Sequence, residues 1–266
     1  MLKLEGVSKT FYPGTVNEKR ALNKVTLHLA PGDFVTVVGS NGAGKSTLFN
    51  AICGVFYADE GSIVLGGEDV TFKPEYRRSR EIGRLFQDPM KGTAPHMTIE
   101  ENLSLAYLRT AKNQHAFFAR VGKKDRAFFR EQLAVLNMGL EDRMSQPVGL
   151  LSGGQRQALT LMMATMVPPK LLLLDEHTAA LDPATAEKVL DITRRVVQQH
   201  KITTLMVTHN MKNALELGNR TLMMDSGHIV LDISGEKREK MTVTDLLEQF
   251  KAGAGKDLDN DRILLS

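Results

Sequence analysis

Apolar and polar residues alternate along the first part of the chain. Residues 2–7 and 25–29 carry apolar side chains at nearly every second position, and the turn dipeptides Pro13-Gly14 and Pro31-Gly32 follow them. A period of two is typical of a strand that buries one face, and Pro-Gly pairs interrupt strands at turns. The amino-terminal segment is therefore predicted to form an antiparallel β subdomain.

Three short runs further along the chain are apolar throughout. Residues 34–38, 171–174 and 204–207 show no alternation, which is typical of strands covered on both faces in a parallel sheet. Asp182-Pro183 fits the start of a helix between the second run and the third. Residues 222–230 have the pattern of a hairpin. Together these elements predict an α/β fold with a mostly parallel sheet.

The middle third of the chain lacks strand patterns. Residues 93–166 carry apolar side chains at helical spacing, and Thr98 and Glu101 fit the two ends of a capping box. We expect a helical subdomain here, inserted in the core of a single domain that spans residues 1–250. The segment 251–266 contains glycines and charged residues and is expected to be a flexible carboxy-terminal tail.

Composition and charge narrow the class of protein. The 266 residues are 42% hydrophobic and 24% charged, as in an ordinary globular chain, and 34 basic residues against 31 acidic ones leave a net charge of +3. So small a charge does not favour nucleic-acid binding through a basic surface. The single cysteine, Cys53, cannot form an internal disulfide, and the charged amino end lacks the apolar run of a secretory signal. A reducing cytoplasm is expected.

A membrane-spanning helix needs roughly 20 consecutive apolar residues. The best candidate, residues 158–174, is interrupted by Pro168-Pro169-Lys170. The sequence predicts no spanning segment, so a role in a membrane process requires another polypeptide to supply the spanning helices.

A glycine-rich segment joins the strand that ends at Val38 to a helix. Two glycines with four residues between them, followed by Lys and Ser, form the pattern of a phosphate-binding loop. Backbone amides and a helix amino terminus converge there, Lys45 neutralises β- and γ-phosphate oxygens, and the Ser46 hydroxyl completes a magnesium shell. The alternative is a glycine-rich turn that binds nothing. The expected nucleotide-binding residues are Gly39, Ser40, Asn41, Gly42, Ala43, Gly44, Lys45, Ser46 and Thr47.

Two adjacent carboxylates follow the four leucines at 171–174. A buried strand that delivers Asp175 to its carboxyl end is suited to hold magnesium, and Glu176 beside it can polarise a water molecule. The pair therefore favours hydrolysis over transfer to a substrate hydroxyl. The alternative is that both are charges at the amino end of the next helix.

Further motifs stand in the order typical of one family. Leu151-Ser152-Gly153-Gly154-Gln155 resembles the signature sequence of the ATP-binding cassette ATPases, and Gln87 resembles the glutamine of their Q-loop. Asp182 resembles their D-loop aspartate and His209 their switch histidine. Phe11, with Tyr12 as a competitor, stands where the family stacks an aromatic ring on adenine. The resemblance covers about residues 2–233.

This resemblance implies a P-loop NTPase core with an amino-terminal antiparallel subdomain and an inserted helical subdomain. It implies ATP and Mg²⁺ as cofactors, with Ser46, Gln87 and, through water, Asp175 at the metal. Glu176 is then the general base, and Lys45, Gln87 and His209 complete the catalytic set. In the family, the signature of one cassette covers the nucleotide of another. Ser152, Gly153, Gly154, Gln155 and Asp182 are thus expected to face ATP held by a second copy, in a homodimer.

The resemblance also implies partners. The leading hypothesis is an ATPase subunit at the cytoplasmic face of the cell membrane that drives a separate permease, gripped by the helical subdomain and residues 91–97. Uptake of a small organic solute such as an amino acid, with a solute-binding protein acting through the permease, is the favoured form. Alternatives are an exporter or lipoprotein-release ATPase, a non-transport cassette on ribosomes or nucleic acid, and a stand-alone kinase. Aromatic and basic residues mix at 117–120 and 127–130, but helical core with solvated arginines is the simpler interpretation, so no nucleic acid is expected.

One position departs from the family pattern. His177 follows the acidic pair where the family commonly has proline. Either its imidazole tunes activity with pH, or it takes no part. The basic run 77–80 is interpreted as a solvated face.

Overall fold

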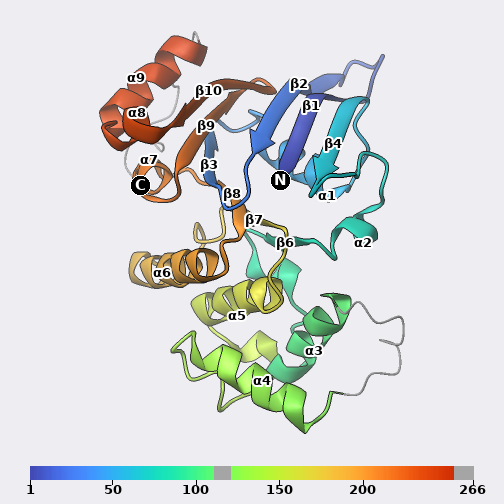
Figure 1. Cartoon of the computed structure of the whole chain (residues 1–266), viewed down its shortest axis with the longest axis vertical. Coiled ribbons are helices and arrows are strands. Elements are labelled where there is room, and N and C mark those ends of the chain that lie inside the picture. The colour runs from blue at the N-terminus through green and yellow to red at the C-terminus, as the bar shows by residue number, and fades with distance from the viewer. Residues whose placement is uncertain (111–120, 255–266) are drawn as a thin grey trace. The chain divides into compact units, whose positions relative to one another are not determined.

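The computed structural model describes residues 1–110 and 121–254 (Figure 1). The chain divides into two compact units, one formed by Met1–Arg78 with Lys201–Ser266 and the other by Ser79–His200. No helix in the described part of the chain is both long and apolar enough to cross a membrane. The aromatic and basic segment at 117–120 and the end of the expected tail, 255–266, lie outside the described residues.

The first unit contains the predicted antiparallel sheet. Strand β1 pairs with β2, and Leu2 lies opposite Leu29 and Leu4 opposite Leu27. These leucines are fully or almost fully buried, which confirms that the alternating positions face a core. The strand order is β2-β1-β4-β5, with β1 at Leu2–Phe11, β2 at Lys19–Leu29, β4 at Glu60–Leu65 and β5 at Glu68–Asp69.

The first unit also contains the strands that carry the glycine-rich loop. Strand β3 pairs in parallel with β8 on one side and β9 on the other, and β10 returns antiparallel to β9. Every residue of β3 and β8 is buried, as the continuous apolar runs predict. The bounds are Phe34–Gly39 for β3, Thr203–Val207 for β8, Arg220–Asp225 for β9 and His228–Ser234 for β10.

The helices of the first unit are α1 (Lys45–Cys53), α2 (Glu75–Arg78), α7 (Met211–Glu216), α8 (Gly235–Glu239) and α9 (Val243–Ala254). Leu246 of α9 is buried in one cluster with Val38 and Met211, so this carboxy-terminal helix belongs to the core of its unit. It ends at Ala254, four residues beyond the domain boundary expected at 250.

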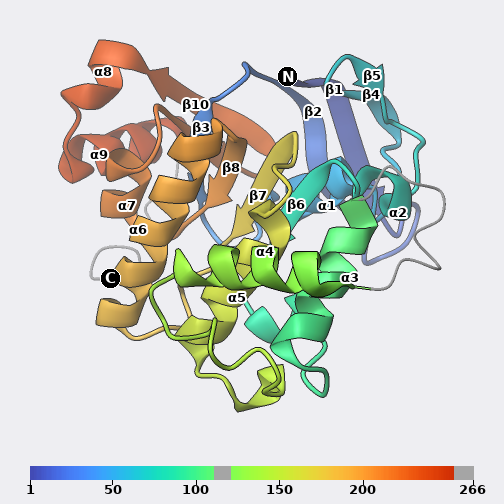
Figure 2. The same ribbon diagram turned by 60° about the horizontal axis from the view of Figure 1, so that its bottom comes forward.

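The second unit combines a parallel strand pair with helices. Strands β6 and β7 pair from Ile82–Leu171 to Leu85–Leu174. Apart from one isolated bridge, the described residues between 93 and 166 contain no strand, and helices α3 and α4 lie beside α5 (Figure 2). The elements are β6 (Ile82–Leu85), η1 (Pro89–Gly92), α3 (Ile99–Thr110), α4 (Lys123–Ala134), η3 (Val148–Leu150), α5 (Gly153–Thr165), β7 (Leu171–Asp175) and α6 (Pro183–His200).

Both predicted helix starts of this unit are confirmed. The Thr98 hydroxyl accepts from the Glu101 amide at 3.2 Å, and the Glu101 carboxylate accepts from the Thr98 amide at 2.7 Å, which is the reciprocal capping box. At α6 the Asp182 carboxylate accepts from the Thr185 amide at 3.0 Å, with proline as the first helical residue.

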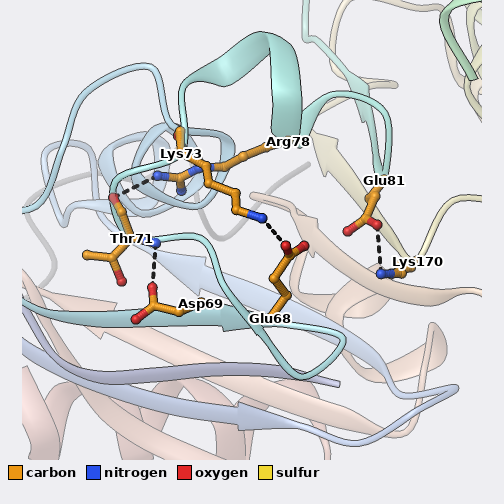
Figure 3. Close-up of polar contacts among 7 residues, drawn as sticks. All are labelled: Glu68, Asp69, Thr71, Lys73, Arg78, Glu81 and Lys170. Atoms are coloured by element: carbon orange, nitrogen blue, oxygen red, sulfur yellow. Dashed lines mark hydrogen bonds and ion pairs between the residues drawn. The ribbon is translucent and has the colours of Figure 1, made fainter. Parts of the chain in front are cut away.

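Arg78 corrects the interpretation of 77–80 as a solvated face. Its side chain is buried, and its guanidinium donates to the carbonyls of Lys73, Ala51, Ile52 and Thr71 at 2.8 to 3.0 Å. Figure 3 shows the contact with Thr71. Carbonyls at a helix end lack partners within the helix. Arg78 therefore satisfies the end of α1 and ties it to the loop after β5, and burial lowers its pKa.

We predict that Arg78→Met lowers the free energy of unfolding by about 2 to 4 kcal/mol, because four buried carbonyls lose a charged donor. Arg77→Met is the matched control, since Arg77 is exposed and lies over the ring of Tyr76; it should change stability by no more than about 0.5 kcal/mol. Urea titrations of both variants make the comparison. Equal midpoints would contradict the anchoring role of Arg78.

Candidate nucleotide-binding site

The loop between β3 and α1 has the backbone of a phosphate cradle. Gly39, Gly42 and Gly44 all have positive φ angles, 153°, 83° and 103°. A Cβ at Gly39 would lie 2.3 Å from the Met224 carbonyl oxygen, and one at Gly44 would lie 2.6 Å from that of Ala21. Both positions exclude any larger residue on steric grounds. Glycine is thus required at 39 and 44 because the backbones of Met224 and Ala21, in the same chain, lie so close.

Lys45 closes this loop from inside. Its side chain is buried, and Nζ donates to the carbonyls of Gly39 at 2.7 Å and Ser40 at 2.9 Å. Helix α1, which is described throughout, starts from a glycine cap without a side-chain acceptor and has no acidic residue in its first turn. Its first amides and the positive end of its dipole are therefore suited to bind an anion such as phosphate. Asn41, Gly42 and Ser46 are exposed around it.

Two further predicted residues belong to the same unit. His209 is half-buried two residues after β8, and parallel pairing of β3 with β8 brings that strand end to the same edge as Gly39. Phe11 is half-buried at the end of β1 and packs edge-on against Phe56, with ring centroids 5.3 Å apart. Tyr12 is 68% exposed.

The second unit brings together another set of predicted residues. Gln87 follows β6 by two residues, and Asp175 and Glu176 stand at the end of β7, so parallel pairing puts all three at one edge. Gln87 is exposed, and the two acids are half-buried. Glu176 has φ +46°, a left-handed conformation that is uncommon outside glycine and clusters at functional sites.

The signature residues form the start of α5. The Ser152 hydroxyl accepts from the Gln155 amide at 3.3 Å, and the Gln155 side chain accepts from the Ser152 amide at 3.2 Å. A Cβ at Gly154 would lie 2.1 Å from Cγ2 of Thr185. Thr185 is also the residue that donates to Asp182, and its side-chain and backbone hydrogen bonds lower the pKa of that carboxyl. The signature and Asp182 are therefore held in contact through one threonine.

His177 is fully buried directly after Glu176. Burial lowers its pKa to about 4, and Nε2 lies 3.2 Å from the Thr193 hydroxyl. Thr193 donates to the Val189 carbonyl, so Nε2 carries the proton that this hydroxyl accepts. The imidazole is neutral near pH 7, which argues against its tuning activity in that range.

Sequence reasoning missed two basic residues at these edges. Lys19 Nζ lies 3.7 Å from the position of a Cβ on Gly42, and Arg84 Nη2 lies 3.5 Å from Asp175 Oδ2. Lys19 starts β2, far from the loop in sequence, and Arg84 interrupts a short strand whose apolar pattern was not recognised. Only strand pairing could have located them.

Comparisons with known proteins agree with this geometry. A family model described as ABC transporter matches residues 22–179. A tyrosine transport ATP-binding protein of Clostridioides difficile (strain R20291) is 40% identical over 252 residues, which cover 94% of this chain and 99% of that protein. A choline transport ATP-binding protein of Bacillus subtilis (strain 168) is 35% identical over 234 residues, 86% of this chain and 56% of the longer relative.

Solved structures show the same fold. A dimeric post-hydrolysis ATP-binding cassette bound to ADP and Pi has a TM-score of 0.76 at 27% identity, covering 88% of this chain and 98% of that one. The ADP conformation of a cassette from an ABC transporter has a TM-score of 0.75 at 27% identity, with 94% and 98% coverage. The fold and loop define a P-loop nucleotide hydrolase. The chain belongs to the ABC transporter family, as an ATP-binding ATPase.

The burial of His177 gives a pH-dependent stability. The pKa of His177 is about 4 in the folded chain, against an ordinary histidine value of 6.5. The unfolded chain therefore binds more protons between these values, and stability falls as pH drops from 6.5 to about 4, by about 3 kcal/mol for this group. We predict that His177→Gln flattens that part of the profile. Urea unfolding across pH 4 to 7.5 tests this. His28→Gln, at an exposed histidine, is the matched control and should keep the wild-type slope, whereas parallel curves for His177→Gln would contradict the prediction.

Proposed function

We propose that this chain is the ATP-hydrolysing subunit of a transporter and powers a separate membrane permease, in a solute-uptake system. One observation carries the proposal: the same chain contains the phosphate-binding loop at 39–47 and the helix start at 152–155, which is already capped by its own side chains. The relative from Clostridioides difficile, a tyrosine transport protein matched over nearly its whole length, supports uptake of an amino acid or a similar small organic solute. A solute-binding protein then acts through the permease, and the subunit works at the cytoplasmic face of the membrane.

The residues of the first unit bind the triphosphate. Amides of the 39–47 loop and the Lys45 ammonium neutralise its β- and γ-phosphates, and for this Lys45 turns from the Gly39 and Ser40 carbonyls toward the phosphate oxygens. His209 contacts the γ-phosphate and senses its presence. The ring of Phe11 stacks on adenine, a role that leaves its contact with Phe56 intact.

The residues of the second unit act on the attacking water. Glu176 accepts its proton as general base, and the left-handed backbone at this position fixes where the carboxylate projects. Ser46 and Gln87 carry oxygen atoms of the kind that Mg²⁺ prefers as ligands, and Asp175 would act on the metal through a water molecule. When bound, Mg²⁺ offsets charge on the phosphate oxygens.

The signature supports a head-to-tail homodimer. Ser152, Gly153, Gly154 and Gln155 form a second helix start whose first residues, Ser152 and Gly153, are exposed, and Asp182 is exposed before the next helix, α6. One chain thus supplies a cradle and a cover, so two copies complete two sites. Hydrolysis at Glu176 separates the copies and resets the permease.

We expect Glu176→Gln to keep ATP affinity, to lower turnover by about a hundredfold or more, and to accumulate a nucleotide-dependent dimer, because only the proton acceptor is removed. Lys45→Ala is the matched contrast: it should lose ATP affinity and show no such dimer. Equilibrium titration, phosphate release without an acceptor substrate, and light scattering measure the three quantities. Normal turnover in Glu176→Gln would exclude it as base, and a monomer at saturating ATP would exclude the shared site.

The permease is tested by purification from membranes. The tagged chain, extracted in mild detergent, should carry a polytopic membrane protein in fixed stoichiometry, and adding that protein back to the purified chain should raise ATP turnover. A tagged cytosolic protein of similar size is the control. Recovery of ribosomal protein or nucleic acid in its place would favour a non-transport cassette and overturn the proposal.

A further inference from the structure

A largely buried arginine, Arg84, lies beside the predicted magnesium aspartate. Arg84 on β6 stands opposite Leu173 on β7, two residues before Asp175. Because side chains alternate along a strand, Leu173 and Asp175 share a face, and Arg84 is their neighbour on it. Its Nη2 lies 3.5 Å from Asp175 Oδ2, and the two side chains are only 14% and 16% exposed. The pair is therefore shielded from solvent by the fold.

The bonding of Arg84 differs from that of two other buried arginines. Arg78 and Arg238 each donate to several carbonyl or hydroxyl oxygens, at 2.6 to 3.0 Å, as structural guanidinium groups do. Arg84 keeps a buried Nε that has no hydrogen-bond partner among the described residues, and its guanidinium lies 4.6 Å from the ring centroid of Phe86. A buried donor without an acceptor is unfavourable and calls for an explanation.

Arg84 also lines a cavity of the second unit. The cavity measures about 330 Å³, Lys91 and Arg109 line it as well, and no acidic residue is among the described lining residues. The cavity offers the long side chain room to move, but every charged residue among its described lining is basic. Among the residues that the structure describes, Asp175 is the acidic partner recorded for Arg84.

We propose that Arg84 is a positioning residue that serves as the counter-charge of Asp175 before magnesium arrives. This rests on the proposed role of Asp175 at the metal. The Asp175 carboxylate that would serve Mg²⁺ through water is the one that Arg84 contacts, and the positive charge of Arg84 opposes the approach of the metal. The chain therefore binds Mg²⁺ more weakly than it would without Arg84, and releases it more readily after hydrolysis.

The test measures magnesium without turnover. The measured quantity is the Mg²⁺ concentration for half-maximal dimer formation, in the Glu176→Gln background at saturating ATP. Arg84→Met should lower this concentration by about fivefold, which corresponds to the loss of an ion pair of about 1 kcal/mol. Methionine keeps an apolar stem against Phe86 and removes the charge. Arg194→Met is the matched control, since it removes an exposed pair with Asp191 at 2.9 Å, and should leave the midpoint unchanged.

A second measurement needs no metal. In EDTA and without nucleotide, Arg84→Met and Asp175→Asn should each lower the melting temperature, and the double variant should be no less stable than the worse single one, because both remove one interaction. Should Arg84→Met fail to fold, Arg84→Lys replaces it and should lower the magnesium midpoint by about twofold, as it keeps the charge but shortens the reach.

The outcomes separate the two proposals. If Glu176→Gln forms a magnesium-dependent dimer and the Arg84 variants share its midpoint, or the double variant shows additive losses, the role of Arg84 is wrong and the ATPase remains. If no magnesium-dependent dimer forms with Arg84 intact, the shared nucleotide site itself is wrong.

Discussion

Parallel strand pairing decides where the chemistry of this protein lies. In a parallel pair, both strands end at the same edge of the sheet. Residues distant in sequence are brought together there by strand pairing, without any direct interaction between their motifs. Gly39 and His209 share such an edge in one unit, and Gln87 and Asp175 share one in the other. Buried apolar strands fix the positions of the glycine loop, the acidic pair and the histidine, and the unbroken leucines of β7 serve that placement as well as the core.

Much of the fold could be predicted because local pattern and tertiary environment agree. The alternation at 2–7 and 25–29 predicts the antiparallel pair, and the structure places those same residues opposite one another. The apolar runs at 34–38 and 204–207 form fully buried strands. Strand β6 was missed because it is four residues long and contains a glycine and an arginine, so its burial depends on β7 and not on its own pattern.

The site was predicted in part because its motifs carry their own geometry. The phosphate loop needs glycine where its backbone approaches Met224 and Ala21. An aspartate before a proline, as at Asp182, indicates the start of a helix. Long-range contacts leave no local trace. Nothing in the sequence around Arg78 or Arg84 distinguishes a structural anchor from a solvated charge, and the neutral state of His177 follows from burial that only packing creates.

The cap at Ser152 and Gln155 has a consequence for assembly. These side chains already bond to each other's backbone in a single copy of the chain, and Gly154 already rests against Thr185. The side chains of Ser152 and Gln155 therefore have little rotamer freedom to lose on binding another molecule. Association costs less conformational entropy than it would with a disordered loop. A second molecule can then dock against a surface whose side chains are already in place.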